Sequence, residues 1–248
     1  NEHLFRDMMS YRFEGSKDIG GHNLGNLIFL SLMDITGSFM GAIQAISRIL
    51  KVKGTILPST LDTVTLYAMM EDGTLVRGEN NIPTLNNSID HVFYQKRVEP
   101  QRDALKAIRK ADLIIYGIGS LYTSIMPNLI IPEIVDEIKR NPCQKIYFCN
   151  AMSQPGETDD FSVEDHIRAI EKHSFKNAVD LAIVNDSYIP QNILEAYAKQ
   201  GSYPVKIKEH EHSYRIIVRK LIMFDEKGRI RHNPDAVKKV IEEVIQTI

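Results

Sequence analysis

The feature that most constrains the fold is an alternation of short apolar runs with helical segments in the second half of the chain. ADLIIYG, KIYFCN and VDLAIVND are rich in Val, Ile and Leu, and a segment with helical periodicity follows each of them. Strands that are apolar along their whole length are typical of parallel sheets buried on both faces. The sequence therefore predicts an α/β fold, with a mainly parallel sheet and helices on both faces.

The first half of the chain carries different signals. Residues 23–34 are expected to form a helix that is apolar most of the way round, and a helix of this kind is expected to be buried. The Asp72-Gly73 pair between alternating segments predicts a hairpin. Residues 55–95 then form either a small subdomain or an antiparallel extension of the sheet. No stretch resembles a flexible linker, so we expect 1–248 to be a single domain.

Composition and charge exclude several classes of protein. The net charge of −2 gives no basic field that would attract a nucleic acid polymer. No apolar run reaches the ~20 residues of a membrane span. The two cysteines, Cys143 and Cys149, have no zinc-binding spacing and are expected to be reduced thiols. We therefore expect a cytoplasmic protein.

Three polar loops follow the three apolar runs and are expected to meet. Right-handed crossovers place the carboxyl ends of parallel strands at one edge of the sheet, and ligands bind outside that edge. The first loop begins at Gly117, the second at Asn150 and the third at Asn185. We expect Asn150, Asn185 and Asp186 to face a ligand, because an acidic or amide group there often meets a sugar hydroxyl. A simple turn or helix cap is the alternative.

The glycine loop is the candidate for binding phosphate. It is not a Walker A loop, because no Gly-Lys-Ser/Thr follows, and Tyr122 stands where a dinucleotide fingerprint has its third glycine. Glycine lets the backbone approach a ligand, and N–H groups at the next helix start can bind phosphate oxygens. The alternative is a tight turn with a capped helix. The predicted phosphate-binding residues are Gly117, Gly119, Ser120, Thr123 and Ser124.

A second polar cluster lies in GGHNLGN. His22, Asn23 and Asn26 precede or enter an apolar helix, and helix N-termini favour anions. We expect these three residues to contact phosphate or substrate, and a capping role for Asn23 is the alternative.

The sequence predicts no metal site and no catalytic residue. Asp159 and Asp160 could hold a metal, but a solvated loop that leads into a helix capped by Ser162 is the preferred interpretation. No Ser/His/Asp order and no Cys/His pair stands out. The residues therefore indicate a phosphorylated ligand more clearly than they indicate a reaction.

Five segments, taken together and in order, resemble the bacterial YvcK family. They are GHNLGN, ILPSTLDTVTLYAMMEDGTLVRGE, ADLIIYGIGSLYTSIMPNLIIPEI, NAMSQPGETDDFSVEDHI and RHNPDAV. Members of this family are named putative gluconeogenesis factors and belong to the CofD-like group, whose enzyme member is 2-phospho-L-lactate transferase. The resemblance implies a Rossmann-like fold with a phosphate site in a cytoplasmic protein. It also implies a nucleotide or nucleotide-sugar ligand, with a UDP-sugar favoured, and a role in carbon use and cell-wall morphogenesis.

The chain departs from the family pattern at its start. The family opens with a strand, a GGGTG-type loop and an Asp-Asp-Gly-Gly segment, whereas this chain begins at Asn1 with a segment that looks helical. We expect the chain to lack the first strand or strands of the family fold.

Three hypotheses for the function follow. The leading one is a regulatory protein, acting as a homo-oligomer, that binds a nucleoside diphosphate or a nucleotide sugar and needs no cofactor. The alternative is a transferase that acts at a phosphate group, with Mg²⁺ held by carboxylates. The third is a scaffold whose pocket no longer binds a ligand.

Overall fold

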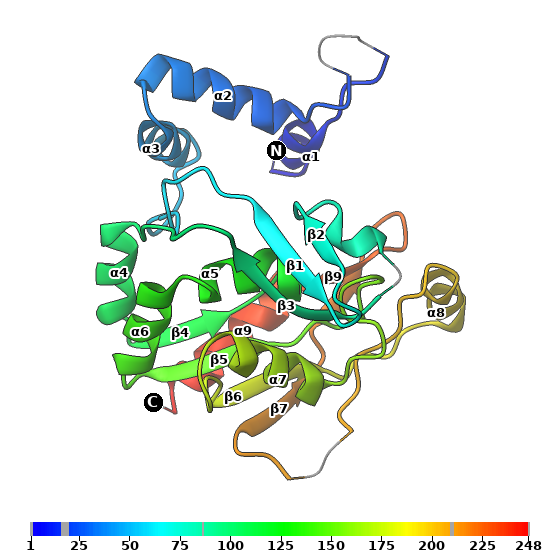
Figure 1. The fold of residues 1–248 in the computed structure, drawn as a ribbon. Coiled ribbons are helices and arrows are strands. Elements are labelled where there is room, and N and C mark those ends of the chain that lie inside the picture. The colour runs from blue at the N-terminus through cyan, green and yellow to red at the C-terminus, as the bar shows by residue number, and fades with distance from the viewer. Residues whose placement is uncertain (1, 16–19, 86, 209–210, 248) are drawn as a thin grey trace. The chain divides into compact units, whose positions relative to one another are not determined.

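The computed structural model describes residues 2–15, 20–85, 87–208 and 211–247. The chain divides into two compact units, residues 1–61 and 62–248. Figure 1 shows both units, and each is described by itself.

The first unit consists of helices. Its elements are α1 (Glu2–Ser10), α2 (Leu24–Thr36) and α3 (Phe39–Ile49). The predicted helix is confirmed as α2, and the side chain of Asn23 caps it by accepting the N–H of Asn26 at 3.2 Å. The expectation that this helix is buried is wrong, because no residue of α2 is buried. In the described part of this unit only Ala42 and Ile43 are buried. A unit of a few short helices has a large surface for its volume, so it cannot bury a whole helix.

None of the described helices alone is both long and apolar enough to cross a bilayer. Of these helices, only α2 and α3 together have that length and composition, and they are bent by 117° relative to each other.

The second unit begins with a small antiparallel sheet in the order β2-β1-β3. Its strands are β1 (Leu66–Met70), β2 (Leu75–Arg77) and β3 (Ile89–Tyr94), and the 3₁₀ helix η1 (Ile82–Thr84) lies between the last two. The predicted hairpin is confirmed: Gly73 has a φ of +85°, and Asp72 Oδ1 accepts the N–H of Thr74 at 2.8 Å. This sheet is separate from the parallel sheet described next.

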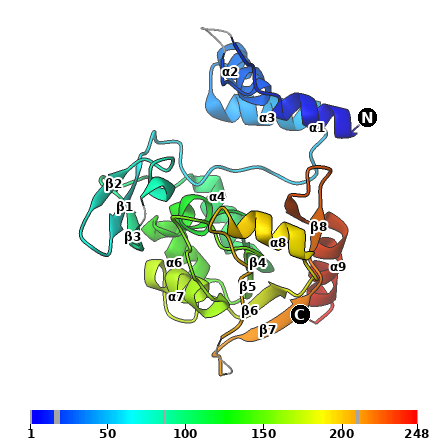
Figure 2. The same cartoon turned by 90° about the vertical axis from the view of Figure 1, so that its right-hand side faces the viewer.

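A four-stranded parallel sheet forms the centre of the second unit, in the order β4-β5-β6-β7. Its strands are β4 (Leu113–Tyr116), β5 (Gln144–Phe148), β6 (Leu181–Asn185) and β7 (Arg215–Arg219). The helical elements around it are α4 (Arg102–Arg109), the π-helical turn η2 (Leu121–Ile125), α5 (Met126–Leu129), α6 (Pro132–Arg140), α7 (Val163–His173), α8 (Gln191–Ala198) and α9 (Pro234–Ile245). Figure 2 shows α9 on one side of the sheet and α6 and α7 on the other.

Burial on both faces of this sheet confirms the predicted α/β class. Along β5, Tyr147 packs into a cluster shared with α6, α7 and the small sheet. Ile146 and Phe148 pack into a second cluster that contains Val240 and Val244 of α9. Successive residues of one strand therefore enter cores on opposite faces, which is why the strand is apolar throughout.

A short hairpin precedes the last helix. It pairs β8 (Ile222–Phe224) with β9 (Ile230–His232), and α9 follows with Asn233 as its N-cap. This hairpin matters for the site, because β9 carries the segment Ile230–His232 to the carboxyl edge of the parallel sheet.

Candidate functional site

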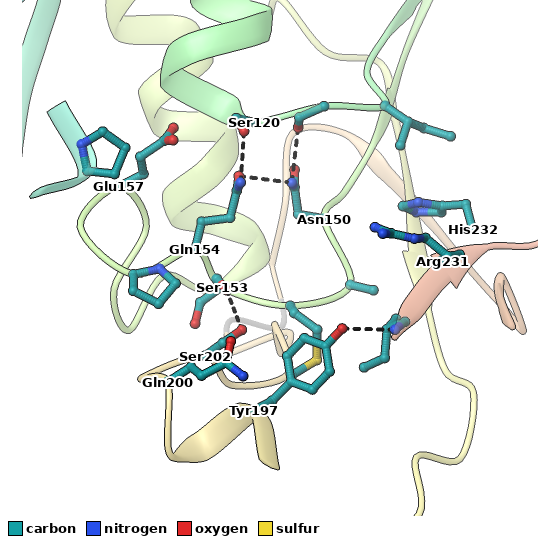
Figure 3. Close-up of a pocket in the computed structure, with 17 residues that line it drawn as sticks. Ser120, Asn150, Ser153, Gln154, Glu157, Tyr197, Gln200, Ser202, Arg231 and His232 are labelled. Atoms are coloured by element: carbon teal, nitrogen blue, oxygen red, sulfur yellow. Dashed lines mark hydrogen bonds between the residues drawn. The ribbon is translucent and has the colours of Figure 1, made fainter. Parts of the chain in front are cut away.

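A cavity of about 630 Å³ lies beyond the carboxyl ends of β4 and β5. Four segments and one residue of η1 form it: the loop after β4, the loop after β5, the end of α8, and β9 (Figure 3). The residues that line it are Pro83, Ile118, Gly119, Ser120, Asn150, Ala151, Met152, Ser153, Gln154, Pro155, Glu157, Tyr197, Gln200, Ser202, Ile230, Arg231 and His232. The structure therefore brings together the first two loops that the sequence placed at this edge.

The glycines after β4 serve the turn itself. Gly117 has a φ of +108°, which L side chains rarely adopt, and a Cβ there would lie 3.1 Å from the carbonyl oxygen of Phe148. Gly119 lies outside the left-handed region, but a Cβ there would lie 2.9 Å from Cβ of Ser124. Close packing inside the turn thus explains both glycines without a ligand. Of the five residues predicted to bind phosphate, Gly119 and Ser120 line the cavity.

Asn150 joins the two loops. Its Nδ2 donates to the carbonyl oxygen of Gly119 at 3.0 Å, and its Oδ1 accepts the hydroxyl of Tyr147 at 3.2 Å. Gln154 extends this network, because its Nε2 donates to Ser120 Oγ at 2.8 Å. Ser120 Oγ is the acceptor in that bond, which leaves its hydrogen for an acceptor in the cavity. Asn150 and Gln154 therefore fix the side chain and backbone of the glycine loop.

Glu157 places a carboxylate in the cavity wall. It is only 6% exposed, and Thr123 Oγ1 donates to its two oxygens at 3.1 and 3.4 Å. The nearby backbone amides of Tyr122 and Thr123 also favour the charged form of this carboxylate. Burial raises the pKa of Glu157, and the Thr123 hydroxyl and these amides oppose that rise without cancelling it. The hydroxyl of Thr123, at the start of η2, is thus already engaged by an acid of the protein.

Arg231 and His232 supply the basic groups of the cavity. Among the described residues that line it, Arg231 is the only Lys or Arg, and Glu157 is the only Asp or Glu. Figure 3 shows Arg231 and His232 across the cavity from Glu157. The Nε2 atom of His232 is buried without a hydrogen-bond partner among the described residues, and burial lowers the pKa of this imidazole. Arg231 therefore gives one end of the cavity a positive group, whose Nε also lies 3.7 Å from Asp225 Oδ2, and Glu157 gives the other end an acidic group.

Tyr197 holds β9 in place at this cavity. Its hydroxyl accepts the N–H of Ile230 at 2.8 Å, which ties β9 to the end of α8. Ser202 Oγ donates to the carbonyl oxygen of Ser153 at 2.6 Å and ties the turn after α8 to the loop after β5. Both bonds fix the cavity wall without using the side chain of Arg231.

Asn185 and Asp186 do not line the cavity. The Oδ1 atom of Asn185 accepts from the N–H and the hydroxyl of Ser187 and from the N–H of Leu221, at 3.3, 2.8 and 3.0 Å. Asp186 is exposed, and its N–H donates to the carbonyl oxygen of Arg219 at 2.9 Å. Asn185 therefore closes a turn beside β7, and contact of these two residues with a ligand stays a prediction.

The GGHNLGN residues lie in the first unit. Asn23 caps α2, while His22 and Asn26 are exposed. Contact of His22, Asn23 and Asn26 with a ligand stays a prediction.

The described residues contain no group of three or more His, Cys, Asp or Glu side chains arranged for a metal ion. Asp159 and Asp160 are exposed, and Asp159 Oδ2 accepts the N–H of Gly156 at 2.7 Å. Asp159 therefore stabilises its own loop. Ser162 caps α7 as predicted, in a capping box with Asp165.

Sequence reasoning missed most of the cavity wall. It placed Gln154 only as part of the second converging loop, and it did not single out Glu157, Tyr197, Arg231 or His232. The signal for Glu157 was the length of the polar loop NAMSQPGETDD. The signal for Arg231 and His232 was RHNPDAV, which stood among the resembling segments without a ligand contact being assigned to either residue.

The comparison with family models gives one match. The model of the 2-phospho-L-lactate transferase CofD family matches residues 1–222. This match covers most of both units.

Curated relatives carry a different name. The gluconeogenesis factor of Halalkalibacterium halodurans is 38% identical over 245 residues, which is 98% of this chain and 76% of the relative. The gluconeogenesis factor of Bacillus subtilis is 38% identical over 248 residues, or 99% of this chain and 78% of the relative. The putative gluconeogenesis factor of Thermotoga maritima is 39% identical over 250 residues, with 98% and 79% covered.

Solved structures agree with these matches. A crystal structure of a Bacillus halodurans protein superposes with a TM-score of 0.90 at 38% identity, covering 96% of this chain and 78% of that one. A second crystal structure from the same organism, described as a member of the UPF0052 family, gives a TM-score of 0.89 at 38% identity over the same shares.

Proposed function

We propose that this chain, which belongs to the CofD family and within it to the YvcK-type gluconeogenesis factors, binds a nucleoside diphosphate or a nucleotide sugar. A UDP-sugar is the favoured ligand. The observation that carries the proposal is the cavity of about 630 Å³ at the carboxyl edge of the sheet. Its volume falls within the range of small-molecule sites, and this edge is where open α/β sheets bind ligands.

The phosphate groups are assigned to the side of the cavity that carries Arg231. An Arg guanidinium binds phosphate oxygens with paired N–H donors, and such bonds are stronger than those between neutral groups. The hydroxyl of Ser120 is held by Gln154 with its hydrogen available, and Gly119 lies next to it in the cavity lining. Thr123 would join this set only if its hydroxyl left Glu157.

A regulatory role without catalysis is the form of this proposal that we favour. Among the described residues that line the cavity, Glu157 is the only carboxylate. The transferase alternative is favoured by the family model, and Mg²⁺ belongs to that alternative because phosphoryl chemistry usually needs a divalent cation.

The experiment is a calorimetric titration of the complete protein with UDP, UDP-glucose, ADP and GDP, with and without Mg²⁺. Saturable binding of a uridine compound supports the proposal. Incubation of the same mixtures, followed by chromatography, tests the transferase alternative, which predicts new products. Absence of saturable binding to every compound would favour the scaffold hypothesis.

The cellular role is part of the same proposal. A regulator of carbon use and cell-wall morphogenesis should act in the cytoplasm, and we propose a homo-oligomer. Deletion of the gene should then alter growth on gluconeogenic carbon sources and cell shape. Light scattering of the purified protein tests the oligomeric state.

A further inference from the structure

The carboxylate of Glu157 occupies the position at which the sequence placed a phosphate group. The hydroxyl of Thr123 donates to one anion, the backbone amides of Tyr122 and Thr123 favour its charge, and that anion is a side chain of the protein itself. A ligand phosphate at the same donors would have to displace Glu157 or lie against it, and like charges repel. The phosphate therefore belongs elsewhere in the cavity.

The carboxylate still has acceptor capacity that faces the cavity. Its two oxygens offer about four acceptor positions, and among the described residues the Thr123 hydroxyl donates to both oxygens. Glu157 lines the cavity, and Figure 3 shows its carboxylate on the side of Ser120 and Gln154. Burial and the bond to Thr123 restrict this side chain, which lowers the entropic cost of accepting one further hydrogen bond.

The charges of the cavity give a ligand its direction. Arg231 and His232 lie across the cavity from Glu157, so an anionic group is favoured at their end and a neutral hydrogen-bond donor at the other. A ligand that carries phosphate and hydroxyl groups a few bonds apart can place the phosphate near Arg231 and a hydroxyl near Glu157. Phosphorylated sugars and the ribose of a nucleotide both have this chemistry.

We propose that Glu157 is a specificity-determining residue that accepts hydrogen bonds from hydroxyl groups of the ligand, so that the cavity selects phosphorylated ligands with free sugar hydroxyls. This inference rests on the proposed function and deepens it. It concerns the part of the ligand that is not phosphate, and it makes Thr123 a positioning residue for Glu157 rather than a phosphate contact. The hydroxyls belong either to the ribose or to the second sugar of a nucleotide sugar.

The test is a set of calorimetric titrations with UDP-glucose, UDP, 2′-deoxy-UDP and inorganic pyrophosphate. The protein variants are the wild type, Glu157→Gln and Thr123→Val. Glu195→Gln is the matched control, because Glu195 is an exposed residue of α8 that does not line the cavity. Circular dichroism checks that each variant is folded.

Loss of a hydrogen bond to a charged group should weaken binding of the hydroxyl-bearing ligand about 10-fold to 100-fold in Glu157→Gln. Thr123→Val should give a smaller loss, and Glu195→Gln none. If Glu157 binds a ribose hydroxyl, 2′-deoxy-UDP should bind wild type more weakly than UDP does, and Glu157→Gln should not weaken the binding of 2′-deoxy-UDP further. If Glu157 binds a hydroxyl of the second sugar, Glu157→Gln should lower the affinity for UDP-glucose and not the affinity for UDP.

Two results would overturn the inference alone. If wild type and Glu157→Gln bind UDP-glucose with equal affinity, and also bind UDP with equal affinity, then Glu157 does not contact a ligand hydroxyl. Tighter binding of pyrophosphate and UDP to Glu157→Gln would show that the carboxylate only obstructs the phosphate position. The inference can be tested on wild type alone if the variant does not fold. Equal affinities of wild type for UDP, 2′-deoxy-UDP and UDP-glucose would contradict it. Failure of wild type to bind any of these compounds overturns the proposed function and the inference together.

Discussion

Gly156 is the residue at which the loop after β5 meets η1, and it permits no side chain. Its φ is +76°, and a Cβ there would lie 2.1 Å from the carbonyl oxygen of Pro83 in η1. Gly201 is a matched control, because its φ is +77° but a Cβ would meet only Pro155 at 3.7 Å. An alanine in the left-handed region costs about 1–2 kcal/mol at either position. Gly156→Ala adds about 1–3 kcal/mol because backbone atoms must move apart.

Urea unfolding followed by circular dichroism measures this difference. With a slope of about 2 kcal/mol/M, the midpoint of Gly156→Ala should lie roughly 0.5–1.5 M below that of Gly201→Ala. Because Glu157 is the next residue, Gly156→Ala should also weaken ligand binding, whereas Gly201→Ala should affect it less. Equal midpoints for the two variants would refute the reasoning, since they would mean that the loop does not dock on η1 as the structure shows.

Three further predictions concern charge. Arg231→Ala should lower the affinity for UDP about 10-fold to 100-fold by calorimetry. Arg229→Ala should change it little, because Arg229 does not line the cavity, although both arginines lie near Asp225 Oδ2, Arg229 at 2.6 Å and Arg231 at 3.7 Å; equal losses in the two would contradict the phosphate assignment. Asp159→Asn combined with Asp160→Asn should leave affinity within about threefold, and a larger loss that Mg²⁺ restores in the single variants would favour the transferase. Burial lowers the pKa of His173, whose Nε2 accepts a main-chain N–H of β3, so the folded state holds the neutral ring. The contribution of His173 to the free energy of unfolding should therefore be fully present above pH ~6.5 and be lost as the pH drops below that value. The acid-induced decrease in this free energy should be smaller in His173→Gln. An equal decrease in wild type and variant would mean that other groups cause it.

Local signals in the sequence predicted the elements of the second unit well. The apolar runs gave the parallel strands, since a strand between two cores must be apolar on both faces. Asp72-Gly73 gave the hairpin, and Ser162 gave the start of α7, because both depend on side chains within four residues. Such interactions need no knowledge of the rest of the fold.

Contacts between residues far apart in the sequence could not be predicted from these local signals. The apolar composition of α2 predicts that other residues pack against it, but it does not identify those residues. In the structure no residue of α2 is buried. Glu157 looks like any acid of a polar loop until the fold brings it to Thr123, 34 positions away in the sequence. Arg231 lies at the cavity on β9, which pairs with β8 and is bonded to Tyr197 of α8, and neither contact is visible in the local sequence.

The decisive measurement is a crystal structure of the protein with a bound UDP-sugar. We expect the diphosphate between Ser120 and Arg231, with Asn150 beside it, and a ligand hydroxyl within hydrogen-bond distance of the Glu157 carboxylate. A diphosphate held by the N–H groups of Tyr122 and Thr123, with Glu157 displaced, would contradict the proposed binding mode, and so would a ligand bound outside this cavity.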